Sequence, residues 1–292
     1  MKQLRLITLG RLALLAGEGE TARPVAVRPR HLAVLAVLAL SPRAVGRETL
    51  AELFWGDEPE VNARHSLSNA LSALRSVLGA ESISSYRETV AIAADVAMTV
   101  DAAEFEVACE RGDAARAVAL YGGPFLDHTP AVGSRTFEEW LDQHRARFER
   151  QFVASCERVG PDLLRCAEYE RAASVAERWL RAAPRSTLAL GTLVRARAAT
   201  GSPSELHAAL VEFERARRWL HDEYAIEPDV SVCTEIAQLG ERLKVAEREA
   251  LAAADVPRAK RAWPTRRRPT WSCLMRPLRS ALHSLRRELQ PE

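Results

Sequence analysis

The stretch "NARHSLSNALSALRSVLG", residues 62–79, decides the fold of the N-terminal part of the chain. Its leucines at 67, 71, 74 and 78 are three or four residues apart, a spacing that predicts one apolar face of a helix. Gly79 is well placed to end that helix. The opposite face is polar, and no Asp or Glu occurs between residues 61 and 80. A face without carboxylates suits a phosphate-bearing partner, although an ordinary solvated face is the simpler interpretation.

The elements predicted around this helix favour a phosphate-bearing partner for its polar face. Short apolar alternations indicate strands, and an almost wholly apolar run behind Pro29 indicates a buried helix. Together they predict a winged helix-turn-helix with an N-terminal sheet, in which the third helix enters the DNA major groove. The predicted elements are strands at 4–9, 12–15 and 24–27, helices at 29–42, 46–55 and 59–78, and a β-hairpin at 82–95.

From residue 99 to about 252 the pattern is helical and rich in alanine and leucine. Gly and Pro residues, Pro161 among them, are expected to break this region into helices of about 10–25 residues. The segments 169–184 and 206–224 both carry paired alanines followed by Trp-Leu, which indicates stacking like that of tetratricopeptide repeats. The predicted fold class is therefore mainly α with a small β component: a winged helix followed by an all-α, tetratricopeptide-like region.

The predicted domains are 1–97, 98–252 and 253–292, and charge indicates that the three parts of the chain meet different partners. The net charge of +2 hides an uneven distribution. Residues 1–99 have 11 basic and 10 acidic side chains, residues 100–254 have 20 and 26, and residues 255–292 have 10 and 3. The last domain is basic and proline-rich, with a leucine stripe at 278, 282, 285 and 289. Solvated disorder, a non-specific nucleic-acid arm and a membrane-surface segment all stay open for it.

Several classes of function find no support in the sequence. The five cysteines form no CxxC pair and the seven histidines have no HxxH spacing, so no metal site is predicted. The phosphate-binding motifs GxxxxGK[ST] and GxGxxG are absent, and no group of residues suggests catalysis. We therefore expect no cofactor and no enzyme activity. No apolar run is long enough to span a bilayer, and a cytoplasmic protein is expected.

Three strings in the sequence resemble a known family. These are "LFWGDEPEVNARHSLSNALSALR" within residues 28–79, "YGGPFLDH" with "TFEEWLDQHRARFERQ" further on, and "DEYAIEPD" at 222–229. They are similar to the SARP-type regulators (Streptomyces-antibiotic-regulatory-protein-like), which join an OmpR-type winged helix to a bacterial transcriptional activator domain. The resemblance covers about residues 4–245. It implies sequence-specific binding to double-stranded DNA at promoters, often at direct repeats, and activation of transcription.

The resemblance also implies which residues contact DNA. On the third helix they are Arg64, His65, Ser68, Asn69, Ser72 and Arg75. At the hairpin tip, Tyr86 and Arg87 are expected to approach the DNA backbone or minor groove. The hairpin lacks the Gly-Tyr that OmpR-type wings commonly carry near its end.

The predicted partners are double-stranded DNA, RNA polymerase and a second copy of the chain, while a membrane is not expected. A homodimer or side-by-side array offsets weak binding at a single site by raising the effective concentration. The rival hypothesis is a protein-interaction scaffold whose winged helix no longer binds DNA specifically.

Overall fold

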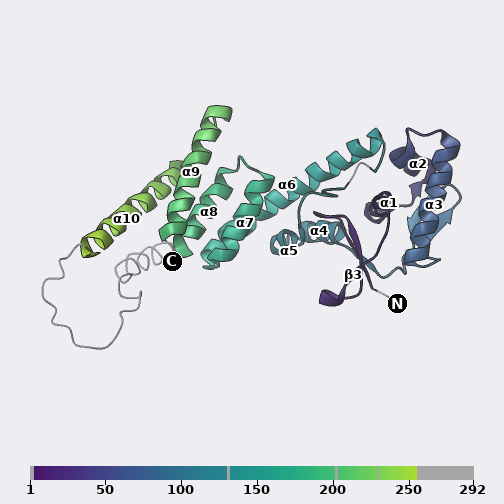
Figure 1. Cartoon of the computed structure of the whole chain (residues 1–292), viewed down its shortest axis with the longest axis horizontal. Helices are drawn as coiled ribbons and strands as arrows, with labels where there is room; N and C mark the ends of the chain where they lie inside the picture. The colour runs from purple at the N-terminus through teal and green to yellow at the C-terminus, as the bar shows by residue number, and fades with distance from the viewer. Residues whose placement is uncertain (1–2, 130–131, 201–202, 229, 255–292) are drawn as a thin grey trace. The chain divides into compact units, whose positions relative to one another are not determined.

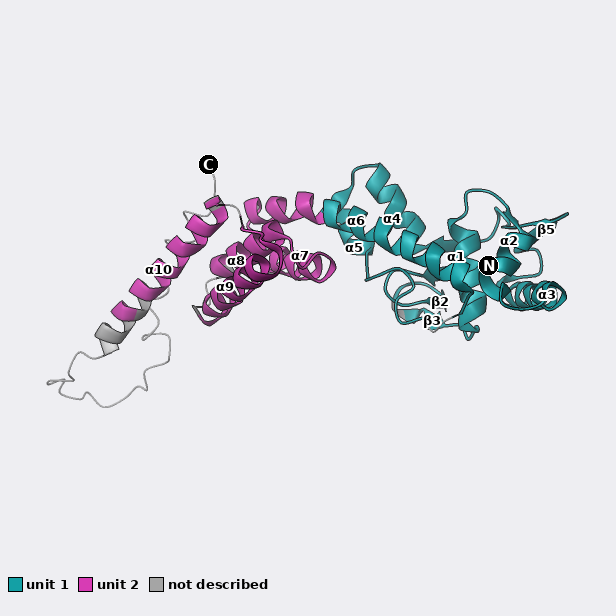
Figure 2. Cartoon of the chain, turned by 90° about the horizontal axis from the view of Figure 1, so that it is seen from above, with its two compact units in different colours: residues 1–155 teal, residues 156–292 magenta. Residues whose placement is uncertain are grey.

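The computed structural model describes residues 3–129, 132–200, 203–228 and 230–254, and Figure 1 traces them along the chain. Contacts divide the chain into two compact units, Met1–Ser155 (unit 1) and Cys156–Glu292 (unit 2), which Figure 2 colours separately. The elements of unit 1 are β1 (Leu4–Ile7), β2 (Ala13–Ala16), the 3₁₀ turn η1 (Gly19–Thr21), β3 (Arg23–Pro24), α1 (Pro29–Leu40), β4 (Val45–Gly46), α2 (Arg47–Trp55), α3 (Glu60–Leu78), β5 (Ile83–Tyr86), β6 (Thr89–Ile92), β7 (Met98–Val100), α4 (Asp101–Glu110) and α5 (Ala114–Leu120). Helix α6 (Arg135–Arg165) begins in unit 1 and ends in unit 2, which also holds α7 (Tyr169–Ala182), α8 (Thr187–Thr200), α9 (Pro203–Tyr224) and α10 (Val230–Ala254).

The described residues of unit 1 form two small sheets. The first has the strand order β3-β2-β1-β7, in which β1 is antiparallel to β2 and parallel to β7. The second has the order β4-β6-β5, in which β5 and β6 form the hairpin that we call the wing. The predicted strands, three helices and hairpin are thus present in the predicted order. Strands β4 and β7 were not predicted.

The helices of unit 1 pack as their sequences indicate. Helix α1 is buried almost all round over Leu32–Leu38, as expected for a helix with no polar face. Helix α2 supplies Phe54, whose ring lies 4.8 Å from that of Phe137 in α6. The hydroxyl of Ser134, just before α6, donates to the carbonyls of Glu52 and Leu53 at 2.8 and 2.9 Å. These contacts join the first turn of α6 to the end of α2.

A buried carboxylate ties the first sheet to α4. Asp101 is 4% exposed and begins α4. The backbone N–H groups of Thr8 and Leu9 donate to its oxygens at 2.8 and 2.9 Å, and the Thr8 hydroxyl donates at 2.6 Å. Because β7 pairs with β1 and leads directly into α4, the domain boundary predicted near residue 97 lies inside unit 1.

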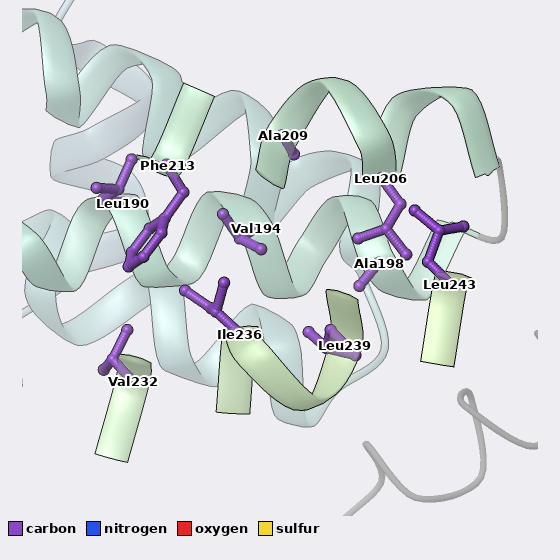
Figure 3. Packing of buried hydrophobic residues seen from close by; sticks show 10 residues of the cluster. All are labelled: Leu190, Val194, Ala198, Leu206, Ala209, Phe213, Val232, Ile236, Leu239 and Leu243. Carbon is purple, nitrogen blue, oxygen red and sulfur yellow. The ribbon is translucent and has the colours of Figure 1, made fainter. Parts of the chain in front are cut away.

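The described residues of unit 2 form helices and the short connections between them. Helices α7 and α9, which carry the two similar segments, are the first members of the successive helix pairs α7–α8 and α9–α10. Figure 3 shows apolar side chains of α8, α9 and α10 pointing toward one another. This cluster includes Val194, Phe213 and Ile236, each less than a tenth exposed. Such pairwise packing of neighbouring helices is typical of a helical solenoid.

The prediction that Pro161 breaks the chain is wrong, because Pro161 lies inside α6. Its missing N–H removes one helical hydrogen bond, to the carbonyl of Glu157, yet α6 continues to Arg165. The preceding Gly160 also packs closely in unit 2: a Cβ there would lie 3.3 Å from a methyl group of Thr192 and 3.6 Å from the Trp179 ring. The predictions for the basic tail, apart from its first two residues, lie outside the described residues.

Candidate nucleic-acid interface

Helix α3 buries the face that its leucines predict. Ala63, Leu67, Ala70, Leu71 and Leu74 are at most 5% exposed and pack within unit 1. The helix begins after Pro59 and has Glu60 in its first turn, where a negative charge suits the helix dipole. It ends at Gly79, whose φ of 117° favours glycine and whose N–H donates to the carbonyl of Arg75. The buried face fixes which side chains face outward.

Five of the six residues predicted on α3 form an exposed surface, which we call the α3 polar face. Its members are Arg64, His65, Ser68, Asn69 and Ser72. Their side chains carry donors and acceptors suited to base edges and phosphates. No carboxylate of α3 lies on this face except Glu60 at its start. The structure therefore brings these five predicted residues together on one side of the helix.

The sixth predicted residue, Arg75, is engaged within the protein. Its Nε donates to the carbonyl of Ile83 at 3.1 Å, and its Nη2 donates to the hydroxyl of Ser85 at 2.8 Å. Both acceptors belong to β5, so the guanidinium group holds the wing against the end of α3. Arg75 is thus a positioning residue in this conformation.

Replacing Arg75 by Ala is expected to loosen the wing. Two hydrogen bonds are lost, each with a net worth of about 0.5–1.5 kcal/mol, so hydrogen exchange in β5 and β6 should accelerate by about tenfold. Ser76→Ala is the matched control, because among the described residues the Ser76 hydroxyl donates only to the carbonyl of Ala73, within its own helix. Mass-spectrometric hydrogen exchange of both variants measures the difference. Unchanged protection of the hairpin in Arg75→Ala would show that Arg75 does not hold it.

Ion pairs and hydrogen bonds modify the α3 polar face. Arg64 pairs with Glu60 at 2.6 Å across one helical turn, and both side chains are exposed. Arg47, the first residue of α2, donates from Nη2 to the Ser68 hydroxyl at 3.0 Å, and its backbone N–H donates to the carbonyl of Glu88 in the wing turn at 2.7 Å. Arg47 therefore stands where α2, α3 and the wing meet. Sequence reasoning missed it, although an arginine opening the second helix was a visible signal.

The wing tip presents the two predicted side chains to solvent. Tyr86 is 70% exposed, and the Arg87 guanidinium lies 5.3 Å from the centre of its ring. Tyr86 pairs with Thr89, so Arg87 and Glu88 form a two-residue turn. Arg87 has a φ of 52°, a conformation that costs a non-glycine residue about 1–2 kcal/mol. The turn thus projects an aromatic ring and a cation together.

A polar groove of about 660 Å³ borders the α3 polar face on the side of Asn69. Arg28, Arg30 and His31 line its other side at the start of α1. Burial lowers the pKa of His31, and the charges of Arg28 and Arg30 lower it further. At neutral pH the imidazole is therefore mainly uncharged, and the two arginines supply most of the positive charge of the groove.

The arrangement can bind an extended, polar, anionic surface, because it combines a protruding helix, a hairpin tip and cations at their edges. Within the described ranges, no group of three or more His, Cys, Asp or Glu residues could hold a metal ion. Nor is any helix of the described residues long and apolar enough to cross a membrane.

Comparisons with known proteins place this geometry in context. The family described as "Bacterial transcriptional activator domain" matches residues 91–238, more than half of the chain. An "Uncharacterized 47.3 kDa protein in thcA 5'region" of Rhodococcus erythropolis is 30% identical over 125 residues, which are 43% of this chain and 26% of that protein. The chain thus spans about a quarter of the length of this curated relative. The solved structure "Mycobacterium tuberculosis EmbR in complex with low affinity phosphopeptide" matches 87% of this chain and 72% of its own, with a TM-score of 0.58 and 18% identity, which shows a shared fold.

Proposed function

Because the chain belongs to the SARP-type transcriptional regulators, the family that carries the bacterial transcriptional activator domain, we propose that it binds promoter DNA through its winged helix and activates transcription. The observation that carries the DNA part is the α3 polar face, five exposed donor-bearing side chains on the third helix of the unit, beside the wing. The family match begins at residue 91 and so does not include this face. The assignment of DNA contacts therefore rests on the geometry of unit 1.

In the proposed complex, α3 lies in the major groove. Asn69 and Arg64 are suited to the edges of adenine and guanine, and Ser68 and Ser72 to either base or phosphate. Tyr86 and Arg87 reach the neighbouring backbone or minor groove from the wing tip. Arg47 adds a phosphate contact at the edge of α3.

Electrostatic attraction to DNA is expected to be modest. Glu60 neutralises Arg64, and residues 1–99 have only one more basic than acidic side chain. Binding at a single site is therefore weak, and two copies on direct repeats raise the apparent affinity through effective concentration. In this proposal the helical domain contacts RNA polymerase, and the protein acts in the cytoplasm.

The same modest charge supports the second candidate, a protein-interaction scaffold whose winged helix does not bind DNA specifically. A winged helix that serves only as a scaffold needs no excess of cations, since protein partners carry no regular array of phosphates. The two candidates differ in whether the α3 polar face selects particular DNA sequences.

Selection of genomic DNA by the purified full chain tests the proposal. At low salt, we expect the bound fragments to be enriched in one motif that occurs twice in the same orientation. Addition of the chain should then increase transcription by RNA polymerase from an enriched promoter. Retention of fragments without a shared motif, or of none at all, would favour the scaffold. A decrease in transcription would mean repression in place of activation.

A further inference from the structure

Helices α9 and α10 line an open groove. It has a volume of about 830 Å³ and is lined by α9 from His207 to Arg218 and by α10 from Cys233 to Lys244. Each lining stretch is about 17 Å long at 1.5 Å per residue, the length of three helical turns. The groove lies within unit 2 and takes no part in the proposed DNA interface.

The floor of the groove is apolar and continuous with the core of unit 2. Phe213, Ile236 and Leu243, three of the side chains drawn in Figure 3, line it together with Leu210. Val211 lies beside them and is 49% exposed. An exposed apolar side chain beside an apolar floor indicates a surface that a partner covers.

Gly240 keeps the groove open. It lies in the interior of α10, where glycine is about 1 kcal/mol less favourable than alanine. A Cβ at this position would meet only Cδ1 of Leu210, at 3.9 Å, which is ordinary van der Waals contact. Close packing therefore does not require a glycine here. The missing side chain of Gly240 leaves space between α9 and α10.

The rim of the groove carries surplus positive charge. Lys244 pairs with Glu241 at 2.7 Å, and Arg217 pairs with Glu214 at 3.1 Å. Arg215 and Arg218 are exposed and, among the described residues, have no carboxylate within ion-pair distance. The groove therefore combines an apolar floor with two cations free to bind a partner.

We propose that this groove binds an acidic amphipathic helix of about three turns from another protein. The apolar face of such a helix fills the apolar floor, and its carboxylates pair with Arg215 and Arg218. Charge argues against the chain's own tail as the occupant, since residues 255–292 have 10 basic and 3 acidic side chains. The inference concerns unit 2 alone and stands whether or not the winged helix binds DNA.

The test uses the full chain and fluorescent synthetic helices of about 14 residues. The acidic probe carries leucines at i, i+4, i+7 and i+11 and glutamates at its other exposed positions, and a second probe has lysines in place of the glutamates. A third peptide is the tail segment 275–292. We expect fluorescence anisotropy to give a Kd of roughly 10 µM for the acidic probe, and this Kd should increase as salt is added. The lysine probe and the tail peptide should bind much more weakly.

Variants at Gly240 locate the binding site. Gly240→Leu fills the groove and is expected to raise the Kd of the acidic probe by at least about tenfold. Gly240→Ala adds only a methyl group and should change this Kd by less than about twofold. Replacement of both Arg215 and Arg218 by Glu should weaken binding of the acidic probe by about tenfold. Circular dichroism and thermal melting confirm that each variant folds.

Three outcomes would overturn the proposal. The first is an acidic probe that does not bind, or that binds Gly240→Leu as well as the natural chain. The second is equal or tighter binding of the lysine probe or the tail peptide. The third is self-association of the chain that Gly240→Leu abolishes, because the groove would then be an interface between two copies.

Discussion

Replacement of both Ser68 and Ser72 by Glu is expected to weaken specific DNA binding by about 100-fold or more, while the protein stays folded. The two serines lie one turn apart on the α3 polar face, and both are exposed. Glutamates there place two negative charges against the phosphates and bases, and each lost specific contact costs about 1–3 kcal/mol. The new carboxylate at position 68 would also attract Arg47, whose guanidinium now donates to the Ser68 hydroxyl, and so withdraw a cation from the DNA.

The matched control replaces Ser174 and Thr234 by Glu. Both lie exposed on helices of unit 2, so this variant has the same net charge but an unchanged winged helix. An electrophoretic mobility shift with a selected genomic fragment compares the variants, and thermal melting checks folding. If the two double variants bind equally well, the α3 polar face does not contact DNA.

The sequence predicts the helices of unit 1 well because their signals are local. Helix α3 was expected at 59–78 and spans Glu60–Leu78, since the leucine spacing, a proline before the helix and a glycine after it all act within the segment itself. The same spacing identifies the five members of the α3 polar face. A helix that buries one face leaves little freedom in what the other face presents.

The features that the sequence does not predict depend on distant partners. Strands β4 and β7 are two and three residues long, too short for a periodic pattern, and form because β6 and β1 lie beside them. Arg75 was expected to face DNA from the family resemblance, yet the carbonyl of Ile83 and the hydroxyl of Ser85 lie within its reach. The tertiary structure decides which group a long side chain such as that of Arg75 contacts.

The hydrogen bonds of Asp101 also depend on distant partners, because nothing near it in the sequence shows that its carboxylate meets Thr8 and Leu9. Asp101→Ala is expected to destabilise unit 1 by about 3–5 kcal/mol, since the buried donors of both residues lose a charged acceptor. For about 155 residues this corresponds to a decrease in Tm of roughly 10 °C. Differential scanning calorimetry measures the change, with the transition of unit 2 as an internal reference.

Two further variants separate the hydrogen bonds of Asp101 from its packing. Thr8→Val keeps the shape of the side chain and removes only the hydroxyl donor, so it should cost about 1–1.5 kcal/mol. Asp101→Asn keeps one acceptor oxygen but turns an NH₂ group toward one of the backbone N–H donors, so an intermediate loss is expected. If Asp101→Ala were no less stable than Thr8→Val, the backbone bonds from Thr8 and Leu9 would contribute little. The connection from β1 to α4, and through it from the winged helix to the activator domain, would then rest on strand pairing with β7 and on apolar packing.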